Sequence, residues 1–113
     1  MTLPHPPLTA AEFQVLVALA DGDKHGYAIG KEVVQRTDGQ VQLRAATLYT
    51  VIKRLLESGL IDENVGRPDP SLDDERRRYY RLTVRGRKAA EAEAGRLEQT
   101  ARQARAKLRP RKA

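Results

Sequence analysis

The residues with the most evident chemistry form a run of cations in the second half of the chain. Seven basic side chains and no acidic one lie between Arg76 and Lys88. The whole chain carries 21 Lys and Arg against 15 Asp and Glu, and residues 44–113 hold 18 of the basic but only 10 of the acidic side chains. A segment with this charge is where a polyanion would bind.

The groups that catalysis or metal binding would need are sparse. His5 lies in a proline-rich leader and His25 in a turn, and neither has an acidic or hydroxyl partner at a recognisable spacing. The chain contains no cysteine and no His-x-x-x-His pair, which excludes thiolate chemistry and the usual zinc sites. We therefore predict that the protein is not an enzyme and has no metal site and no cofactor.

Length and composition favour a single domain. The chain has 113 residues, of which 40% are apolar, enough for one modest core. No apolar run approaches the ~20 residues that span a bilayer, so we expect no membrane partner. The absence of cysteine fits a reducing compartment, and we expect a cytoplasmic protein.

Two helices are predicted near the N-terminus. Thr9 and Glu12 have the spacing of a capping box, which begins a helix over residues 9–21. A second helical pattern covers residues 27–36 and ends in a turn sequence. Residues 40–43 alternate polar and apolar side chains and suit a short strand.

A third helix is predicted with two distinct faces. Its apolar side chains fall within about 100° of helical arc: Leu48, Val51, Ile52 and Leu55. The opposite face carries polar side chains, including Thr50 and Lys53. Ser58 and Gly59 close the helix.

The next segment reads as a hairpin followed by a long helix. Residues 60–65 and 77–82 are strand candidates, joined by a loop rich in proline and aspartate. Tyr79 and Tyr80 must point to opposite faces of the second strand, and we favour Tyr80 inward. Thr83 caps the last helix, which extends to about residue 107.

This last helix carries a narrow apolar seam with spacings of 4, 3, 4, 3 and 4 residues: Ala90, Ala94, Leu97, Ala101, Ala104 and Leu108. The seam can fold back on its own domain or pair with a second helix. A helix of about 25 residues is about 37 Å long, longer than so small a body, so pairing between two chains is favoured.

The order of three helices, an arginine-rich hairpin and a long helix is that of a winged helix-turn-helix protein, mostly α with a small β hairpin. We divide the chain into a flexible leader (1–7), a DNA-binding winged helix-turn-helix domain (8–83), a dimerisation helix (84–108) and a disordered basic tail (109–113). In such a module the third helix enters the major groove and the hairpin lies along the phosphates.

The sequence also resembles the PadR-type transcriptional regulators. The matching residues are Leu8, Thr9 and Glu12, the segments His25–Tyr27, Thr47–Tyr49 and Leu55–Ile61, and Arg77–Thr83 followed by Gly86. The family usually reads Gly-Thr-Leu-Tyr-Pro at the recognition helix, whereas this chain has Ala46 and Thr50 at the outer positions, so its base preference can differ. The resemblance implies the small subclass, in which one C-terminal helix makes the dimer, and repression that ends when a small-molecule effector binds.

These observations assign two sets of residues. The predicted DNA-binding residues are His25, Tyr27, Arg44, Thr47, Tyr49, Thr50, Lys53, Arg54, Arg76, Arg77, Arg78 and Tyr79, and the seam makes the dimer. Each assignment has a plainer alternative: the arginine run can be a solvated strand end, Tyr27 and Tyr49 can simply pack, and His25 can be a turn residue.

We therefore expect a homodimeric, sequence-specific regulator that binds a pseudo-palindromic operator in double-stranded DNA, acting as a ligand-responsive repressor. The alternative is a winged-helix protein-interaction module or an architectural protein that grips nucleic acid without reading its sequence. A specific binder should prefer its operator by ~10³ or more over random DNA, which separates the two classes.

Overall fold

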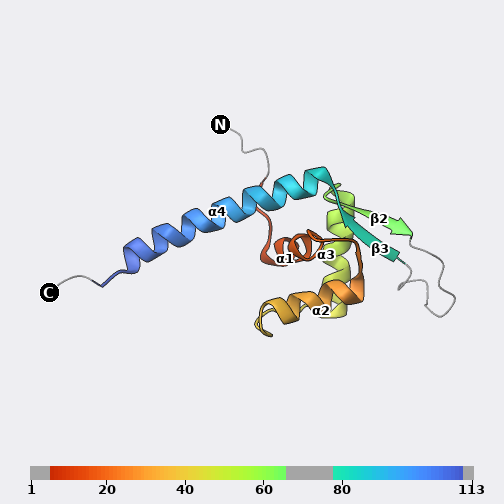
Figure 1. Ribbon diagram of the computed structural model, residues 1–113, viewed down its shortest axis with the longest axis horizontal. Coiled ribbons are helices and arrows are strands. Elements are labelled where there is room, and N and C mark those ends of the chain that lie inside the picture. The colour runs from red at the N-terminus through yellow and green to blue at the C-terminus, as the bar shows by residue number, and fades with distance from the viewer. Residues whose placement is uncertain (1–5, 66–77, 111–113) are drawn as a thin grey trace.

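The computed structural model describes residues 6–65 and 78–110. Its elements are α1 (Ala10–Ala18), β1 (Lys24–His25), α2 (Gly26–Arg36), α3 (Ala45–Glu57), β2 (Ile61–Val65), β3 (Arg78–Leu82) and α4 (Val84–Leu108). The first three helices form one body with β2 and β3 at its side, and α4 extends away from it (Figure 1). The predicted winged helix-turn-helix followed by a long helix is confirmed.

Three parts of the sequence prediction lie outside the described residues. They are the first five residues of the leader, the hairpin loop together with Arg76 and Arg77, and the last three residues of the tail.

The sheet contains one strand that was not predicted. Its order is β1-β3-β2, with both pairings antiparallel. Between β2 and β3, Ile61 pairs with Leu82. The added strand β1 places His25 opposite Tyr79. The sheet therefore attaches the start of α2 to the hairpin.

The predicted strand at residues 40–43 is wrong. The backbone N–H of Val41 donates to the Thr37 hydroxyl oxygen at 3.0 Å. This segment is therefore hydrogen-bonded to the end of α2 and not to a neighbouring strand. Val41 and Leu43 are half-buried against the core. The alternation of side chains is real, but it reflects packing of an irregular segment.

The capping box of α1 is confirmed, whereas its predicted end is wrong. The Glu12 N–H donates to the Thr9 hydroxyl at 3.1 Å, and the Thr9 N–H donates to the Glu12 carboxylate at 2.8 Å. The helix ends at Ala18 instead of residue 21, where side chains from later in the chain bind the carbonyl groups of its last residue and of the turn that follows. Lys24 Nζ donates to the carbonyl of Ala18 at 2.7 Å, and Arg87 donates to that of Ala20 at 3.1 Å.

The core forms where the three helices meet the sheet and the first turns of α4. Its buried members are Val15, Leu16, Ala18, Leu19, Ile29, Val33, Leu48, Val51, Ile52, Leu55, Leu60, Ile61, Tyr80 and Ala89. All four residues predicted for the apolar face of α3 are among them, and Tyr80 points inward as predicted. The core therefore fixes which face of α3 remains outside.

The start of α4 is tied to the turn that follows α3. The Thr83 hydroxyl accepts the N–H of Gly86 at 2.9 Å and lies 2.8 Å from the carbonyl oxygen of Gly59. Gly86 packs directly on the carbonyl of Leu60, which occupies the space that a Cβ would need. A single junction thus joins α3, β2, β3 and α4.

A buried carboxylate fastens the N-terminal segment to α4. Glu93 is 7% exposed and is the buried charged residue of the described chain. Its carboxylate accepts the backbone N–H of Leu8 at 2.8 Å and a guanidinium N–H of Arg96 at 2.7 Å. Both hydrogen bonds stabilise the ionised carboxylate and so lower the pKa of Glu93 below its ordinary value. The hydrogen bond from Leu8 contributes most to this lowering.

Because Gly86 lies so close to other backbone, alanine at this helical position should destabilise the protein, although alanine normally stabilises a helix relative to glycine. Gly86→Ala should destabilise the protein by about 1–3 kcal/mol, because the added methyl group collides with backbone that cannot move aside. Gly95→Ala in the same helix is the control: its Cβ meets nothing within 4 Å, so the higher helix propensity of alanine should stabilise by up to ~1 kcal/mol. Urea unfolding at one protein concentration measures both, and equal effects would contradict the junction.

Glu93 predicts a pH-dependent stability. Glu93→Gln should cost about 1–2 kcal/mol at pH 7, because a charged acceptor is lost. Since folding lowers the pKa of Glu93, this contribution is present above the ordinary glutamate pKa of about 4.3 and is lost as the pH falls through the folded-state value. Unfolding of the two proteins should therefore converge in acid. Exposed Glu57→Gln serves as the control, and a gap that stays constant with pH would contradict the role of the charge.

Candidate nucleic-acid interface

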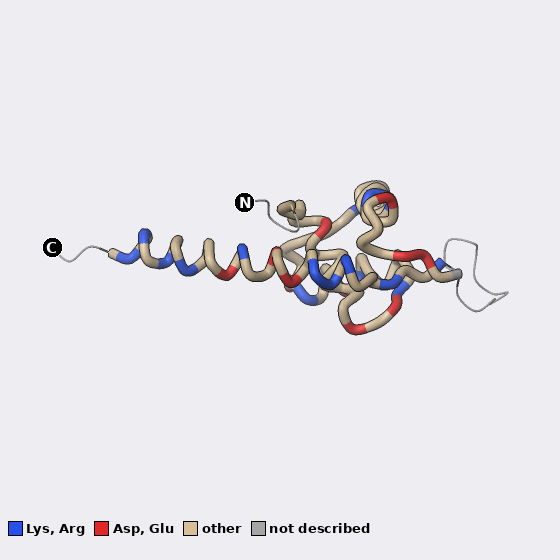
Figure 2. Tube along the Cα trace, turned by 90° about the horizontal axis from the view of Figure 1, so that it is seen from above, with Lys and Arg blue, Asp and Glu red and all other residues tan. Residues whose placement is uncertain are grey.

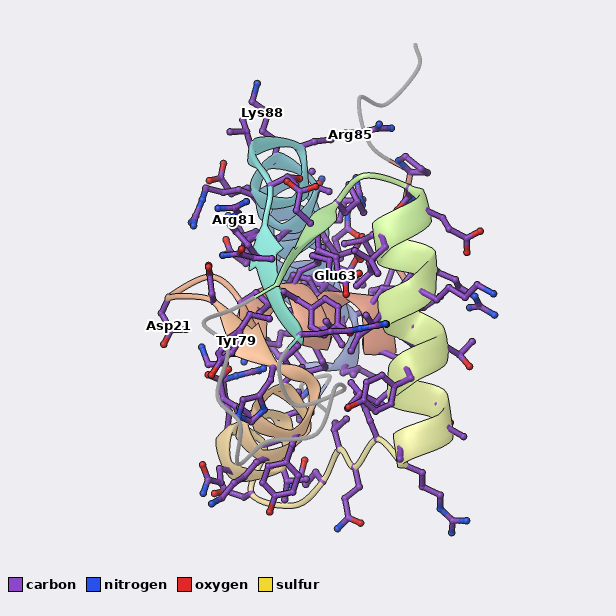
Figure 3. The ribbon with its side chains drawn as sticks, turned by 90° about the vertical axis from the view of Figure 1, so that its right-hand side faces the viewer. Asp21, Glu63, Tyr79, Arg81, Arg85 and Lys88 are labelled. Carbon is purple, nitrogen blue, oxygen red and sulfur yellow. The ribbon has the colours of Figure 1, made fainter. Side chains whose placement is uncertain are left out.

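α3 presents a continuous polar face to the outside. Thr47, Thr50, Lys53 and Arg54 are all exposed on the side opposite the core. Arg44 occupies the N-cap position, and its exposed side chain makes no capping hydrogen bond. Figure 3 shows the side chains of α3 extending away from the body. An α-helix with this face can enter the major groove of DNA, which is about 12 Å wide.

Thr50 lies near the centre of this face, where its hydroxyl is already engaged. Oγ1 donates to the carbonyl oxygen of Ala46 at 2.9 Å. A shallow depression surrounds it, lined by Ala46, Thr47, Thr50, Val51 and Arg54. With its proton used, the Thr50 side chain can offer a base edge a methyl group and an acceptor lone pair. These groups suit a thymine methyl or an exocyclic amine.

The N-terminus of α2 lies beside α3 and is shaped by two residues. His25 is the N-cap of α2, and its Nδ1 accepts the backbone N–H of Ala28 at 3.2 Å. The ring of Tyr49, from α3, lies so close to Gly26 that any Cβ there would overlap its hydroxyl end. The segments His25–Tyr27 and Thr47–Tyr49 are therefore in direct contact.

Three aromatic residues, His25, Tyr27 and Tyr79, gather where α2 meets β3, and we call them the aromatic group. The ring centroids of His25 and Tyr79 are 5.6 Å apart in an edge-to-face arrangement, and those of His25 and Tyr27 are 6.4 Å apart. Tyr27 is 67% exposed. Because His25 uses Nδ1 as an acceptor, its neutral ring carries the proton on Nε2, a donor beside a helix N-terminus, where anions are favoured.

The wing strand contributes one described arginine with an acidic partner. Arg78 Nε lies 3.2 Å from a carboxylate oxygen of Glu63 on β2. The sequence prediction missed this pair, although the register of the hairpin could have identified Glu63 as a cross-strand neighbour. In Figure 3, Glu63 lies between the sheet and α3, whereas Arg81 lies on the side of the sheet away from α3. Arg81 is therefore not part of this interface.

Ten of the twelve predicted DNA-binding residues are described, and they fall on three neighbouring elements. Arg44, Thr47, Tyr49, Thr50, Lys53 and Arg54 belong to α3 and its cap, His25 and Tyr27 to the start of α2, and Arg78 and Tyr79 to β3. Tyr49 is the most constrained, because it packs on Gly26. The prediction did not identify the role of Gly26, which admits the Tyr49 ring.

Two further findings concern the described residues only. Residues 6–65 and 78–110 contain no group of three or more His, Cys, Asp or Glu side chains that could hold a metal ion. Within the same ranges, no helix combines the length and the apolar character needed to cross a membrane.

A three-helix body, an antiparallel wing and an exposed polar face on the third helix define a winged helix-turn-helix protein. The model of the family described as "Transcriptional regulator PadR-like family" matches residues 15–92. The chain therefore belongs to the PadR-like family of transcriptional regulators. Membership in this non-enzymatic family confirms that the protein is not an enzyme.

Solved structures of similar proteins share this fold, and one further relative is similar in sequence. A transcriptional regulator from Clostridium thermocellum is 29% identical, with a TM-score of 0.73 over 88% of this chain and 90% of the other. Bacillus subtilis PadR, solved in complex with operator DNA, is 20% identical, with a TM-score of 0.65 over 76% of this chain and 47% of that protein. An uncharacterised protein of Lysinibacillus sphaericus is 37% identical over 73 residues, which span 65% of this chain and 64% of that protein.

The Arg78–Glu63 pair predicts opposite effects on DNA binding. Arg78→Ala should flatten the plot of log K against log salt by about 0.9, the slope of one phosphate contact. Glu63→Gln should strengthen binding to all duplexes, because it removes a negative charge and releases Arg78. Fluorescence anisotropy over a series of salt concentrations measures both.

The control for this experiment is Arg36→Ala, at the far end of α2, where Arg36 binds Glu32 and Gln14. Its slope should match that of the unmodified protein. An unchanged slope for Arg78→Ala would remove β3 from the interface.

Proposed function

We propose that this protein is a sequence-specific DNA-binding transcriptional regulator that acts in the cytoplasm. α3 enters the major groove, while the aromatic group and Arg78 lie along the phosphate backbone. The observation that carries the proposal is the polar face of α3, which is exposed over its whole length and flanked by cations at Arg44, Lys53 and Arg54. Base contacts from this face would specify the sequence, and phosphate contacts would position the protein.

The likeness to Bacillus subtilis PadR, whose structure contains operator DNA, supports the binding of DNA by this fold. The start of α2 adds physical support, because the backbone N–H groups of a helix N-terminus attract phosphate. His25 Nε2 and the exposed Tyr27 hydroxyl are the donors that would reinforce such a contact.

Selection of bound sequences from random DNA tests the function, followed by competition at one salt concentration. We expect a single preferred motif, bound ~10³-fold or more tightly than random DNA. Binding without a preferred motif would instead support the architectural alternative, and no binding would support a protein-interaction module. The length of the selected motif also reports whether one or two half-sites are read.

We also propose that the protein is a homodimer assembled through the seam of α4. The exposed positions along the seam support this, because Leu97 is 48% and Leu108 80% exposed. The body covers only the first part of α4 (Figure 1). Ala90, at the start of the seam, is half-buried against its own core, and the remaining members extend beyond it. A two-fold dimer presents two recognition helices to a pseudo-palindromic operator.

Release of the operator by a small-molecule effector completes the proposal, and the protein would then act as a repressor. A hollow of about 190 Å³ lies between residues 6–8, the end of α3 and the start of α4, and Glu12 and Arg85 contribute its charges. It is smaller than the roughly 300 Å³ of typical ligand pockets, so one protomer offers room for a small ligand only.

A substitution at Leu97 in the seam tests whether DNA binding depends on the dimer. Leu97→Asp should give a monomer in sedimentation equilibrium, because it would bury like charges across the seam. Operator affinity should fall far more than helix content, since a single half-site supplies only part of the binding free energy.

Exposed Gln99→Asp, away from the seam, is the matched control and should remain a dimer. A dimeric Leu97→Asp variant would show that the seam is not the interface. A monomer that binds the operator undiminished would contradict two-fold recognition.

A further inference from the structure

The depression on the polar face of α3 is lined mainly by residues that carry methyl groups: Ala46, Thr47, Thr50 and Val51, with Arg54 supplying a charge. Val51 is only 4% exposed and belongs to the core, so it forms the floor, whereas the other four residues are exposed. The depression has a volume of about 240 Å³. This is smaller than the roughly 300 Å³ at which ligand pockets begin, so it suits the edge of a group that approaches from outside.

A hydrogen bond orients the Thr50 side chain within this depression. Its hydroxyl donates to the carbonyl oxygen of Ala46 at 2.9 Å, one helical turn earlier. The hydroxyl and the methyl group of threonine branch from the same carbon, so a hydroxyl held by the backbone also holds the methyl group. Thr50 therefore presents a methyl group at a fixed place on the exposed face of α3.

Ala46 and Thr50 are also the two positions at which this chain departs from the usual pattern of its family. The pattern has glycine and proline there, and neither of these residues carries a methyl group or a hydroxyl. In this chain both residues line the depression, and the hydrogen bond joins them. The two departures thus add two methyl groups to one site on the recognition face.

The edges of base pairs offer such a surface a single kind of apolar partner. In the major groove, adenine, guanine and cytosine present hydrogen-bond donors and acceptors, whereas thymine adds a methyl group on C5. A polar edge pressed against methyl groups would lose its water without gaining a partner. Cytosine acquires the same methyl group when it is methylated on C5. The exposed cations Arg44, Lys53 and Arg54 on this face favour a polyanion over a neutral ligand.

We propose that the depression on α3 is a binding site for the 5-methyl group of a pyrimidine in the major groove, and that the methyl groups of Ala46 and Thr50 contact it. The inference rests on the DNA binding proposed above and narrows what α3 reads. At this position of the operator the protein selects thymine over uracil and 5-methylcytosine over cytosine. The Thr50 oxygen has no direct part in this selection. Methylation of a cytosine placed there therefore strengthens binding.

Base analogues test the site without altering the protein. In the operator selected from random DNA, each thymine of one half-site is replaced in turn by uracil, which has the same hydrogen-bonding edge and lacks only the methyl group. At one position the replacement should weaken binding about fourfold, the effect of burying one methyl-sized group. At the same position, 5-methylcytosine should bind about fourfold more tightly than cytosine. Fluorescence anisotropy at one salt concentration measures each duplex.

Variants of Thr50 assign the effect to its methyl group. Thr50→Ser keeps the hydroxyl and loses the methyl group, so both ratios should fall toward one. Thr50→Val keeps a methyl group on the same branch and loses the hydroxyl, so it should retain both ratios. Exposed Thr100→Ser, on the far part of α4, is the matched control and should change neither. Because each result is a ratio of two affinities of one variant, partial unfolding cannot imitate it.

The outcomes separate this inference from the proposed function. Specific binding without a uracil-sensitive thymine, or with a sensitivity that Thr50→Ser leaves unchanged, would overturn the methyl site while the function stood. Ratios that persist in Thr50→Ser but disappear in Thr50→Val would show that the hydroxyl reads the base, which also overturns the site. An unmodified protein that selects no preferred motif would overturn both.

Discussion

The contact of Gly86 with the carbonyl of Leu60 is the constraint on which the functional parts of the molecule depend. Only a residue without a Cβ lets α4 begin there. The Thr83 hydroxyl completes the junction by capping α4 and approaching the carbonyl of Gly59. The end of α3, both long strands and the start of α4 all meet at this point, so the helix proposed to read DNA and the helix proposed to pair with a partner are connected through one junction.

A second contact joins the segments His25–Tyr27 and Thr47–Tyr49, which are distant in the sequence. Gly26 receives the ring of Tyr49, and β1 places His25 against Tyr79. Through these contacts α2, α3 and β3 position one another at the surface that carries the predicted DNA-binding residues. Exchanging Gly26 or Tyr49 alone would leave either a clash or a gap, so each residue type requires the other.

The features that could be predicted from sequence are those determined within a few residues. The capping box at Thr9, the cap at Thr83 and the two faces of α3 depend on neighbours within four or so positions along a helix. The features that were missed depend on distant partners. β1 exists because β3 lies beside it, α1 ends where Lys24 and Arg87 bind the carbonyl groups of Ala18 and Ala20, and the 85-residue separation of Leu8 and Glu93 leaves no local signal.

The same distinction applies to the interface. Exposure of Thr50 and Lys53 follows from helical periodicity, whereas the pairing of Arg78 with Glu63 and the engaged hydroxyl of Thr50 appear only in three dimensions. Counting cations therefore overstates what the described wing strand offers to DNA, since Arg78 already has an acidic partner and Arg81 lies on the side of the sheet away from α3. On the surface that carries the predicted DNA-binding residues, the cations outside the described ion pairs are Arg44, Lys53 and Arg54, on α3 and its cap. Their position is consistent with the proposed role of α3 in reading sequence.

The length of α4 then acquires a functional meaning. In the dimer proposed above, a two-fold axis through the middle of the seam lies at the level of Gln99 along the helix, although Gln99 itself faces away from the seam, and Gln99 is 13 residues from Gly86. At the rise of an α-helix this separation is about 20 Å, so the two junctions of a dimer lie about 40 Å apart along the paired helices. One turn of DNA between half-sites is about 34–36 Å. Because each α3 is joined to this junction, the spacing of the half-sites that such a dimer would read would follow from the length of the helix between Gly86 and Gln99.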